Sequence, residues 1–137
     1  MSLPLSFDEP LVTERLSLRL MTEDDVDAVH DWMSDPEVVR YQLYNVRDRA
    51  TVAEKVAEYA LATRLESNGD YVQPAIVVDG EVVGAIYFTL SSVDHLTAEI
   101  GWVLRRAHQG KGYAFEAASA MLSVAFGEMG LHRVYAE

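Results

Sequence analysis

Apolar and polar residues alternate between Thr13 and Leu20, where Leu16, Leu18 and Leu20 are separated by polar side chains. This period of two predicts a half-buried β-strand. A second strand with apolar residues on one face is predicted over residues 97–104.

The dipeptide Asp79-Gly80 lies between two apolar, β-branched segments at residues 75–78 and 82–88. An Asp-Gly pair in this position is typical of a tight hairpin turn, so we expect two antiparallel strands here. One further strand is predicted over residues 131–136.

Apolar residues at helical spacing and N-terminal capping residues predict four helices. They run from Thr22 to about Ser34, from Asp35-Pro36 over a short span, from the capping box Thr51–Glu54 to about Glu66, and from Tyr113 to about Glu128. Strands and helices in this order predict an α/β (α+β) fold, with a mixed sheet flanked by helices on both faces.

The chain has 137 residues, which is the size of one domain. It carries 22 acidic and 11 basic side chains, and the net charge of −11 opposes nucleic-acid binding and favours a cationic or amine partner. It has no cysteine and no apolar run long enough to span a membrane, and residues 1–9 have no signal-peptide features. We therefore expect a cytoplasmic protein that binds no membrane.

The segment most informative about chemistry is Gln109-Gly110-Lys111-Gly112-Tyr113-Ala114, between a predicted strand and a predicted helix. Two glycines let the backbone approach a ligand, and the N–H groups of the following helix favour an anion such as a pyrophosphate. The spacing fits neither a Walker loop nor a dinucleotide fingerprint. A tight strand-to-helix connection without a ligand explains these glycines equally well.

These residues resemble the phosphate motif of the GNAT superfamily of acetyl-CoA-dependent N-acetyltransferases, Gln/Arg-x-x-Gly-x-Gly/Ala, which Gln109, Gly112 and Ala114 match in place. The resemblance covers most of the chain and is closest to the branch that contains the ribosomal-protein alanine N-acetyltransferases. It is carried further by the segments Leu11–Arg19, Trp32–Val38 and Ala98–Trp102.

The resemblance implies a single acetyl-CoA-binding domain over residues 1–137, with a mostly antiparallel sheet and no metal. The backbone at Val103 and Leu104 would hold the pantetheine arm, and the amides of Gln109, Gly110, Lys111, Gly112, Tyr113 and Ala114 would hold the pyrophosphate. The reaction would be direct acetyl transfer to a primary amine, either a protein N-terminus or a small molecule. Glu99 would be the catalytic base, although a carboxylate that faces solvent or only attracts the ammonium group is the alternative.

Other residues are weaker candidates. Tyr41 and Tyr44 are expected either to line the acceptor pocket or to pack in the core, whereas Trp32 and Trp102 are expected in the core. His108 is expected to be exposed beside the loop, and the four histidines lack the spacing of a metal site.

The chain departs from the family at its C-terminus, where relatives continue for about 30–40 residues with a closing hairpin and the tyrosine thought to protonate the leaving thiolate. The general acid is therefore not assigned. A non-catalytic CoA-binding module or an inactive truncated fragment is the alternative to an active enzyme. Because the last strand would have an open edge, we also expect a homodimer.

Overall fold

The computed structural model describes residues 5–42 and 44–136. Its strands are β1 (Leu5–Ser6), β2 (Leu11–Val12), β3 (Ser17–Arg19), β4 (Arg64–Leu65), β5 (Tyr71–Val72), β6 (Ala75–Val78), β7 (Glu81–Ser92), β8 (Thr97–Leu104) and β9 (Arg133–Ala136). Its helices are α1 (Val26–Met33), α2 (Pro36–Val39), α3 (Arg49–Leu61) and α4 (Tyr113–Ser123), with short 3₁₀ turns η1 (Glu23–Asp25) and η2 (Arg106–His108) and the π turn η3 (Val124–Glu128).

Seven of the strands in the described part of the chain form one sheet, in the order β2-β3-β6-β7-β8-β9, with β5 beside β7. Every pair is antiparallel except β8–β9, which is parallel. The Asp79-Gly80 turn joins β6 to β7, as its sequence predicts. The mixed, mostly antiparallel sheet expected from the sequence is confirmed.

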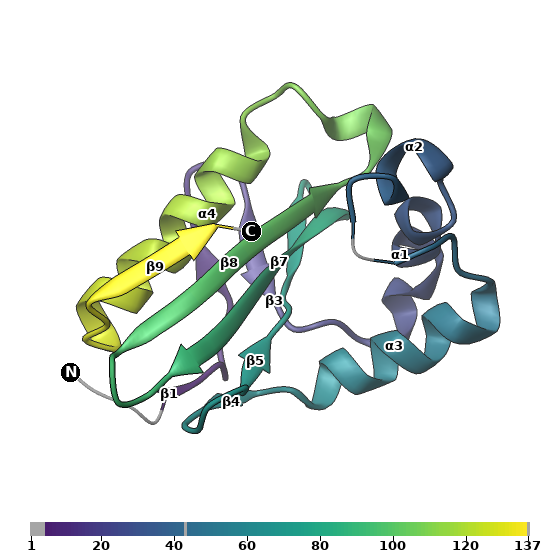
Figure 1. Ribbon diagram of the computed structural model, residues 1–137. Helices are drawn as coiled ribbons and strands as arrows, with labels where there is room; N and C mark the ends of the chain where they lie inside the picture. The colour runs from purple at the N-terminus through teal and green to yellow at the C-terminus, as the bar shows by residue number, and fades with distance from the viewer. Residues whose placement is uncertain (1–4, 43, 137) are drawn as a thin grey trace.

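Helices cover both faces of the sheet, as expected: α4 lies on one face, and α1 and α3 lie on the other (Figure 1). Successive residues of β6 alternate between the two cores, since Ile76 packs with the α4 side and Ala75 with the α1–α3 side. On the α1–α3 side, Trp32 is fully buried in the core, where the sequence places it.

Helix α3 begins and ends earlier than predicted. The Asp48 carboxylate caps it by accepting a 2.8 Å hydrogen bond from the N–H of Thr51, so the expected capping box at Thr51–Glu54 lies inside the helix. The helix ends at Leu61 rather than Glu66, because Arg64 and Leu65 pair with β1.

Strand β9 lies at one edge of the sheet, where it pairs with the first half of β8. Thr97 to Ile100 have partners on β9, whereas residues 101–104 pair only with β7 among the residues that the structure describes. The homodimer expected from this edge stays a prediction.

Candidate functional site

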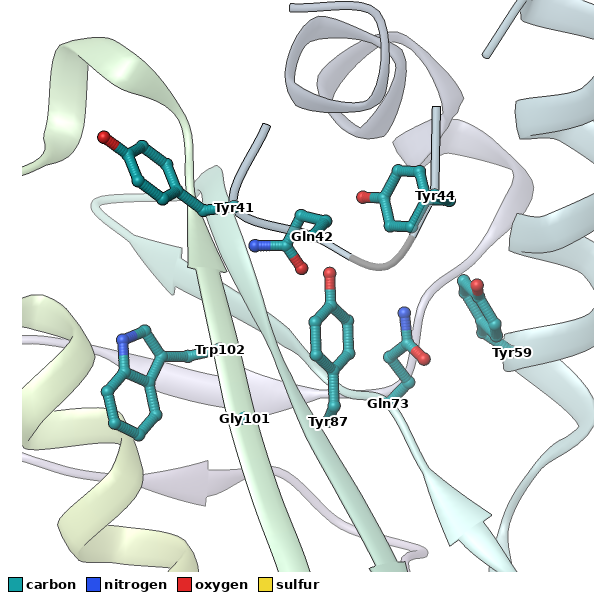
Figure 2. A pocket seen from close by; sticks show the side chains of 8 residues that line it. All are labelled: Tyr41, Gln42, Tyr44, Tyr59, Gln73, Tyr87, Gly101 and Trp102. Carbon is teal, nitrogen blue, oxygen red and sulfur yellow. The ribbon is translucent and has the colours of Figure 1, made fainter. Parts of the chain in front are cut away.

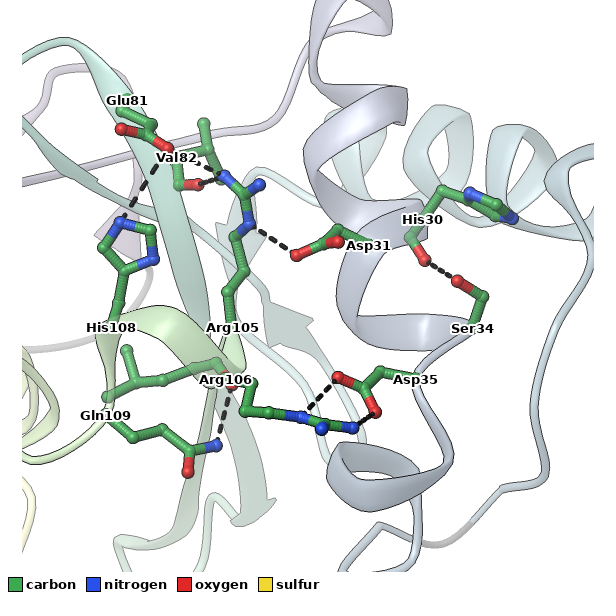
Figure 3. Close-up of polar contacts among 11 residues, drawn as sticks. His30, Asp31, Ser34, Asp35, Glu81, Val82, Arg105, Arg106, His108 and Gln109 are labelled. Atoms are coloured by element: carbon green, nitrogen blue, oxygen red, sulfur yellow. Dashed lines mark hydrogen bonds and ion pairs between the residues drawn. The ribbon is translucent and has the colours of Figure 1, made fainter.

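The residues predicted to hold CoA lie together at the end of β8 and the start of α4. Val103 and Leu104 are buried, and the carbonyl oxygen of Leu104 accepts a 3.2 Å hydrogen bond from the side-chain amide of Gln109 (Figure 3). The motif glutamine therefore fixes the loop to the end of the strand.

The loop leads directly into α4 and contains two glycines in the left-handed region, Gly110 at φ 79° and Gly112 at φ 82°. Glycine adopts this conformation without the strain that a Cβ brings. Gly112 is the N-cap of α4 and has no side chain to cap it, so the first-turn N–H groups, including those of Tyr113 and Ala114, have no acceptor within the helix. The helix dipole and these donors favour an anion here.

Two arginines just before the loop form ion pairs with carboxylates of the chain, so they hold the loop in place rather than bind a ligand (Figure 3). The Arg105 guanidinium contacts Asp31 at 2.8 Å and Glu81 at 3.1 Å. Arg106 pairs with Asp35 and holds the pKa of that carboxyl below its usual range. Lys111 makes no ion pair with any residue that the structure describes, and its charge is available to a ligand.

A second clamp, which the sequence did not reveal, fixes the first turn of α4. The Glu116 carboxylate accepts hydrogen bonds from the Thr13 hydroxyl at 2.5 Å and from Arg15 Nε at 2.6 Å. Arg15 also donates to the carbonyl oxygen of Lys111 at 2.8 Å. The only signal in the sequence is that Thr13 and Arg15 belong to one of the segments that carry the family resemblance.

Two adjoining cavities open beside these elements. One, of about 310 Å³, runs along the loop and is lined by residues that include Val103, Leu104, Gln109 and Ala114. The other, of about 430 Å³, is lined by Tyr41, Gln42, Tyr44, Tyr59, Gln73, Tyr87, Gly101 and Trp102 (Figure 2). Tyr41, Gln42 and Trp102 line both, so the cavities share a wall.

The structure corrects two expectations at this site. Trp102 is 44% exposed and borders both cavities, because the described helices leave this end of the strand uncovered. His108 is partly buried rather than exposed, since its Nε2 lies 3.8 Å from the Glu81 carboxylate in the Arg105 network.

Glu99 is partly buried on β8 and lies outside the residues that line either cavity. Its Oε1 accepts a 2.8 Å hydrogen bond from the hydroxyl of Tyr135. Gly101, two residues further along the same face of the strand, lines the larger cavity. The catalytic role of Glu99 stays a prediction.

Within residues 5–42 and 44–136, no group of three or more His, Cys, Asp or Glu side chains is placed to hold a metal ion. Across the same residues, no helix has the length and apolarity to cross a membrane.

Comparison with known proteins gives consistent results. Residues 15–137 match the family described as "Acetyltransferase (GNAT) domain". The chain is 34% identical over 131 residues to the Bacillus licheniformis protein named uncharacterized N-acetyltransferase p20, covering 94% of this chain and 72% of that relative.

Solved structures agree on the fold. A GNAT-family acetyltransferase from Bacillus anthracis superposes with a TM-score of 0.80 at 33% identity, covering 93% of this chain and 72% of that one. The ribosomal L7/L12 α-N-protein acetyltransferase RimL in complex with coenzyme A has a TM-score of 0.68 at 19% identity, covering 88% and 71%. This chain is therefore shorter than each of these proteins.

Proposed function

Because the chain belongs to the GNAT family of N-acetyltransferases, we propose that it moves an acetyl group from acetyl-CoA to a primary amine on a protein N-terminus or a small molecule. The observation that carries the proposal is the continuity of the site. The glycine-rich start of α4 and the end of β8 border one cavity, and that cavity shares a wall with the larger one.

The residues present fit a CoA pyrophosphate. Uncapped N–H groups at the start of α4 offer positive charge in a chain whose net charge is −11. The Lys111 ammonium group, which has no ion-pair partner among the described residues, adds to it. The end of β8 at Val103 and Leu104 has no partner on the β9 side in the described chain, which leaves this edge open to an extended arm. The carbonyl oxygen of Leu104 is already held by Gln109, so the arm would bind at the other edge-facing backbone groups. Coenzyme A bound to RimL adds support from a protein with the same fold.

When bound, acetyl-CoA supplies a thioester, whose carbonyl carbon forms the new bond to the amine nitrogen as the bond to sulfur breaks. The chain's own residues hold both partners close together and remove one proton from the amine. We assign that proton to the Glu99 carboxylate, reached through water because Glu99 lines neither cavity.

A second candidate function is CoA binding without transfer. It is favoured by the position of Glu99 outside the two cavities. The two candidates differ in one measurable quantity, because both bind acetyl-CoA and only the enzyme releases a free thiol when an amine is added.

Calorimetry with acetyl-CoA tests the shared site. Gly112→Val should lower the affinity for acetyl-CoA at least tenfold. A β-branched residue is strained at φ 82°, and its Cβ would lie 3.2 Å from Arg15 Nη2. Gly69→Val is the matched control, since Gly69 has φ 87°, has open space around it and lies away from the loop.

If the Gly112 variant keeps its fold by circular dichroism and binds acetyl-CoA as tightly as the parent, the site is elsewhere. If the parent does not bind acetyl-CoA at all, both candidate functions are rejected.

A further inference from the structure

The larger cavity has a wall of unusual chemistry for so acidic a chain. Five of the eight described residues that line it are aromatic, namely Tyr41, Tyr44, Tyr59, Tyr87 and Trp102. Two more are the amides Gln42 and Gln73, and the last is Gly101, so the described lining contains no carboxylate. Its volume of about 430 Å³ lies within the range of small-molecule pockets.

The acidic side chains gather elsewhere. Asp24, Asp27, Asp31 and Glu81 border a separate groove, together with Arg19 and Arg105. The net charge of −11 therefore draws cations toward the molecule but supplies no ion pair inside the aromatic cavity.

Two buried hydroxyl groups, those of Tyr44 and Tyr87, belong to the lining of this cavity. They interact with each other, but neither oxygen makes a hydrogen bond of ordinary geometry within the described residues. Figure 2 shows both hydroxyls directed toward the space that Gln42 also lines. A buried hydroxyl without a well-formed hydrogen bond is costly, and a ligand oxygen within reach of both hydroxyls would relieve that cost.

Both hydroxyls act as neutral groups. Burial raises the pKa of Tyr44, and burial raises the pKa of Tyr87 well above the ordinary value for tyrosine. They keep their protons at every pH at which an amine is acetylated, so they offer hydrogen bonds to a neutral oxygen and no negative charge to an ammonium group.

We propose that this cavity selects a small primary monoamine with an aromatic or apolar body and a neutral oxygen, such as an amino-acid amide, and that it excludes polyamines and aminoglycosides. This inference rests on the proposed function, because it names the acceptor of the same site. The aromatic rings contact the body of the acceptor. The guanidinium groups of Arg40 and Arg47 already lie over the rings of Tyr41 and Tyr44, at 4.8 Å and 3.8 Å from the ring centroids, so the single ammonium group is attracted by the other rings. The hydroxyls of Tyr44 and Tyr87 bind the oxygen. A polyamine would have to place a second ammonium group in a wall with no carboxylate, without compensation for its lost hydration.

The test compares three amines in calorimetry, with and without saturating CoA, and then in thiol release from acetyl-CoA. L-Phenylalaninamide has the aromatic body and the oxygen, phenethylamine lacks the oxygen, and spermidine carries several charges. We expect L-phenylalaninamide to bind at least tenfold more tightly than spermidine. A pentapeptide with N-terminal phenylalanine, run beside the amide, shows whether the source is a free small molecule or a chain end.

Tyr87→Phe isolates the hydroxyl, because the ring remains and only the poorly formed contact with the Tyr44 hydroxyl is lost within the described chain. The affinity for L-phenylalaninamide should fall about three- to tenfold, which is the contribution of a neutral hydrogen bond, and the affinity for phenethylamine should change by less than about twofold. Tyr71→Phe is the matched control. The Tyr71 ring packs edge-on against the Tyr59 ring, with 6.3 Å between the ring centroids, but Tyr71 does not line the cavity.

The proposal is overturned if spermidine binds as tightly as L-phenylalaninamide, if L-phenylalaninamide does not bind, or if Tyr87→Phe weakens both aromatic amines equally. If the protein acetylates spermidine but does not bind L-phenylalaninamide, the proposed acceptor class is rejected and the proposed N-acetyltransferase activity is retained. If the protein does not bind acetyl-CoA, the proposed function is rejected instead. In that case the comparison of amine affinities without CoA still tests which amines the cavity selects.

Discussion

The hydroxyl of Tyr135 on β9 donates a 2.8 Å hydrogen bond to Oε1 of Glu99 on β8. The two residues are direct partners in the parallel register of β8 and β9. The contact therefore ties the proposed base to the edge strand of the sheet. It gives Glu99 a fixed orientation that its position on β8 alone would not impose.

If Glu99 accepts the amine proton, Glu99→Gln should lower kcat by about 10²–10⁴, the usual contribution of a general base. Tyr135→Phe should lower kcat by a smaller factor, because the carboxylate loses the donor that fixes its orientation. Both variants should bind acetyl-CoA like the parent. The measurements are a pH–rate profile from thiol release and calorimetry with acetyl-CoA.

The double variant separates positioning from a merely structural effect. If Tyr135 acts through Glu99, then adding Tyr135→Phe to Glu99→Gln changes kcat no further, since the two side chains form one unit. Unchanged turnover and an unchanged pH profile for Glu99→Gln would eliminate the role of the carboxylate and of its partner together.

Local chemistry explains which parts of the fold the sequence predicts. The Asp79-Gly80 turn and the Asp35-Pro36 helix start depend on neighbouring residues alone, and both occur as expected. The predicted start of α3 at Thr51 is wrong, because Asp48 and Thr51 are both suitable N-cap residues and the helix is capped by Asp48. Strands of two residues, such as β4 and β5, are too short to show any periodicity.

The site depends more on distant contacts, which no local pattern encodes. The glycine loop was found because its residues are consecutive, whereas the Thr13–Glu116 contact joins residues 103 positions apart. Trp102 was misplaced because it alternates with Ile100 and Leu104, which are buried, although the end of its own face is left uncovered. Tyr59, Gln73 and Tyr87 come together only through tertiary packing, so the sequence identified Tyr41 and Tyr44 alone in this cavity.

Gly84 on β7 controls the position of the proposed pantetheine strand. A Cβ at Gly84 would lie 2.1 Å from the carbonyl oxygen of Val103 and 3.0 Å from the Cα of Leu104. Gly84→Ala therefore has to push the end of β8 away, and we expect a loss of about 1–3 kcal/mol in the free energy of unfolding, as for other overpacked sites. Acetyl-CoA affinity should fall with it.

Urea unfolding and calorimetry measure the two effects. Gly127→Ala is the control, because no atom lies within 4 Å of its Cβ position, and its stability should change by less than about 0.5 kcal/mol. Equal stability and acetyl-CoA affinity of Gly84→Ala and Gly127→Ala would show that β8 is not held by this close approach.

The Glu116 clamp makes the start of α4 sensitive to acid. The Thr13 hydroxyl, the backbone N–H of Arg15 and the Arg15 guanidinium all donate to this carboxylate, and they lower its pKa to about 2. Because the unfolded chain has the ordinary glutamate pKa of about 4.3, the unfolded state binds the proton first. The contribution of Glu116 to stability is therefore complete above that value and is lost as pH falls toward 2.

This difference predicts how Glu116→Gln compares with the parent. Above pH 5 the parent should be more stable in urea unfolding, because the amide cannot pair with Arg15 as a carboxylate does. This difference in the free energy of unfolding should shrink steadily below pH 4.3 and vanish near pH 2, as the parent's carboxylate becomes protonated. Glu37→Gln is the control, since the Glu37–Arg40 pair is exposed, with its side chains 57–59% accessible, and should show little gap at any pH. A carbon-detected NMR titration of Glu116 with a midpoint near 4.3 would contradict the clamp, and so would a stability gap that does not change between pH 5 and pH 2.5.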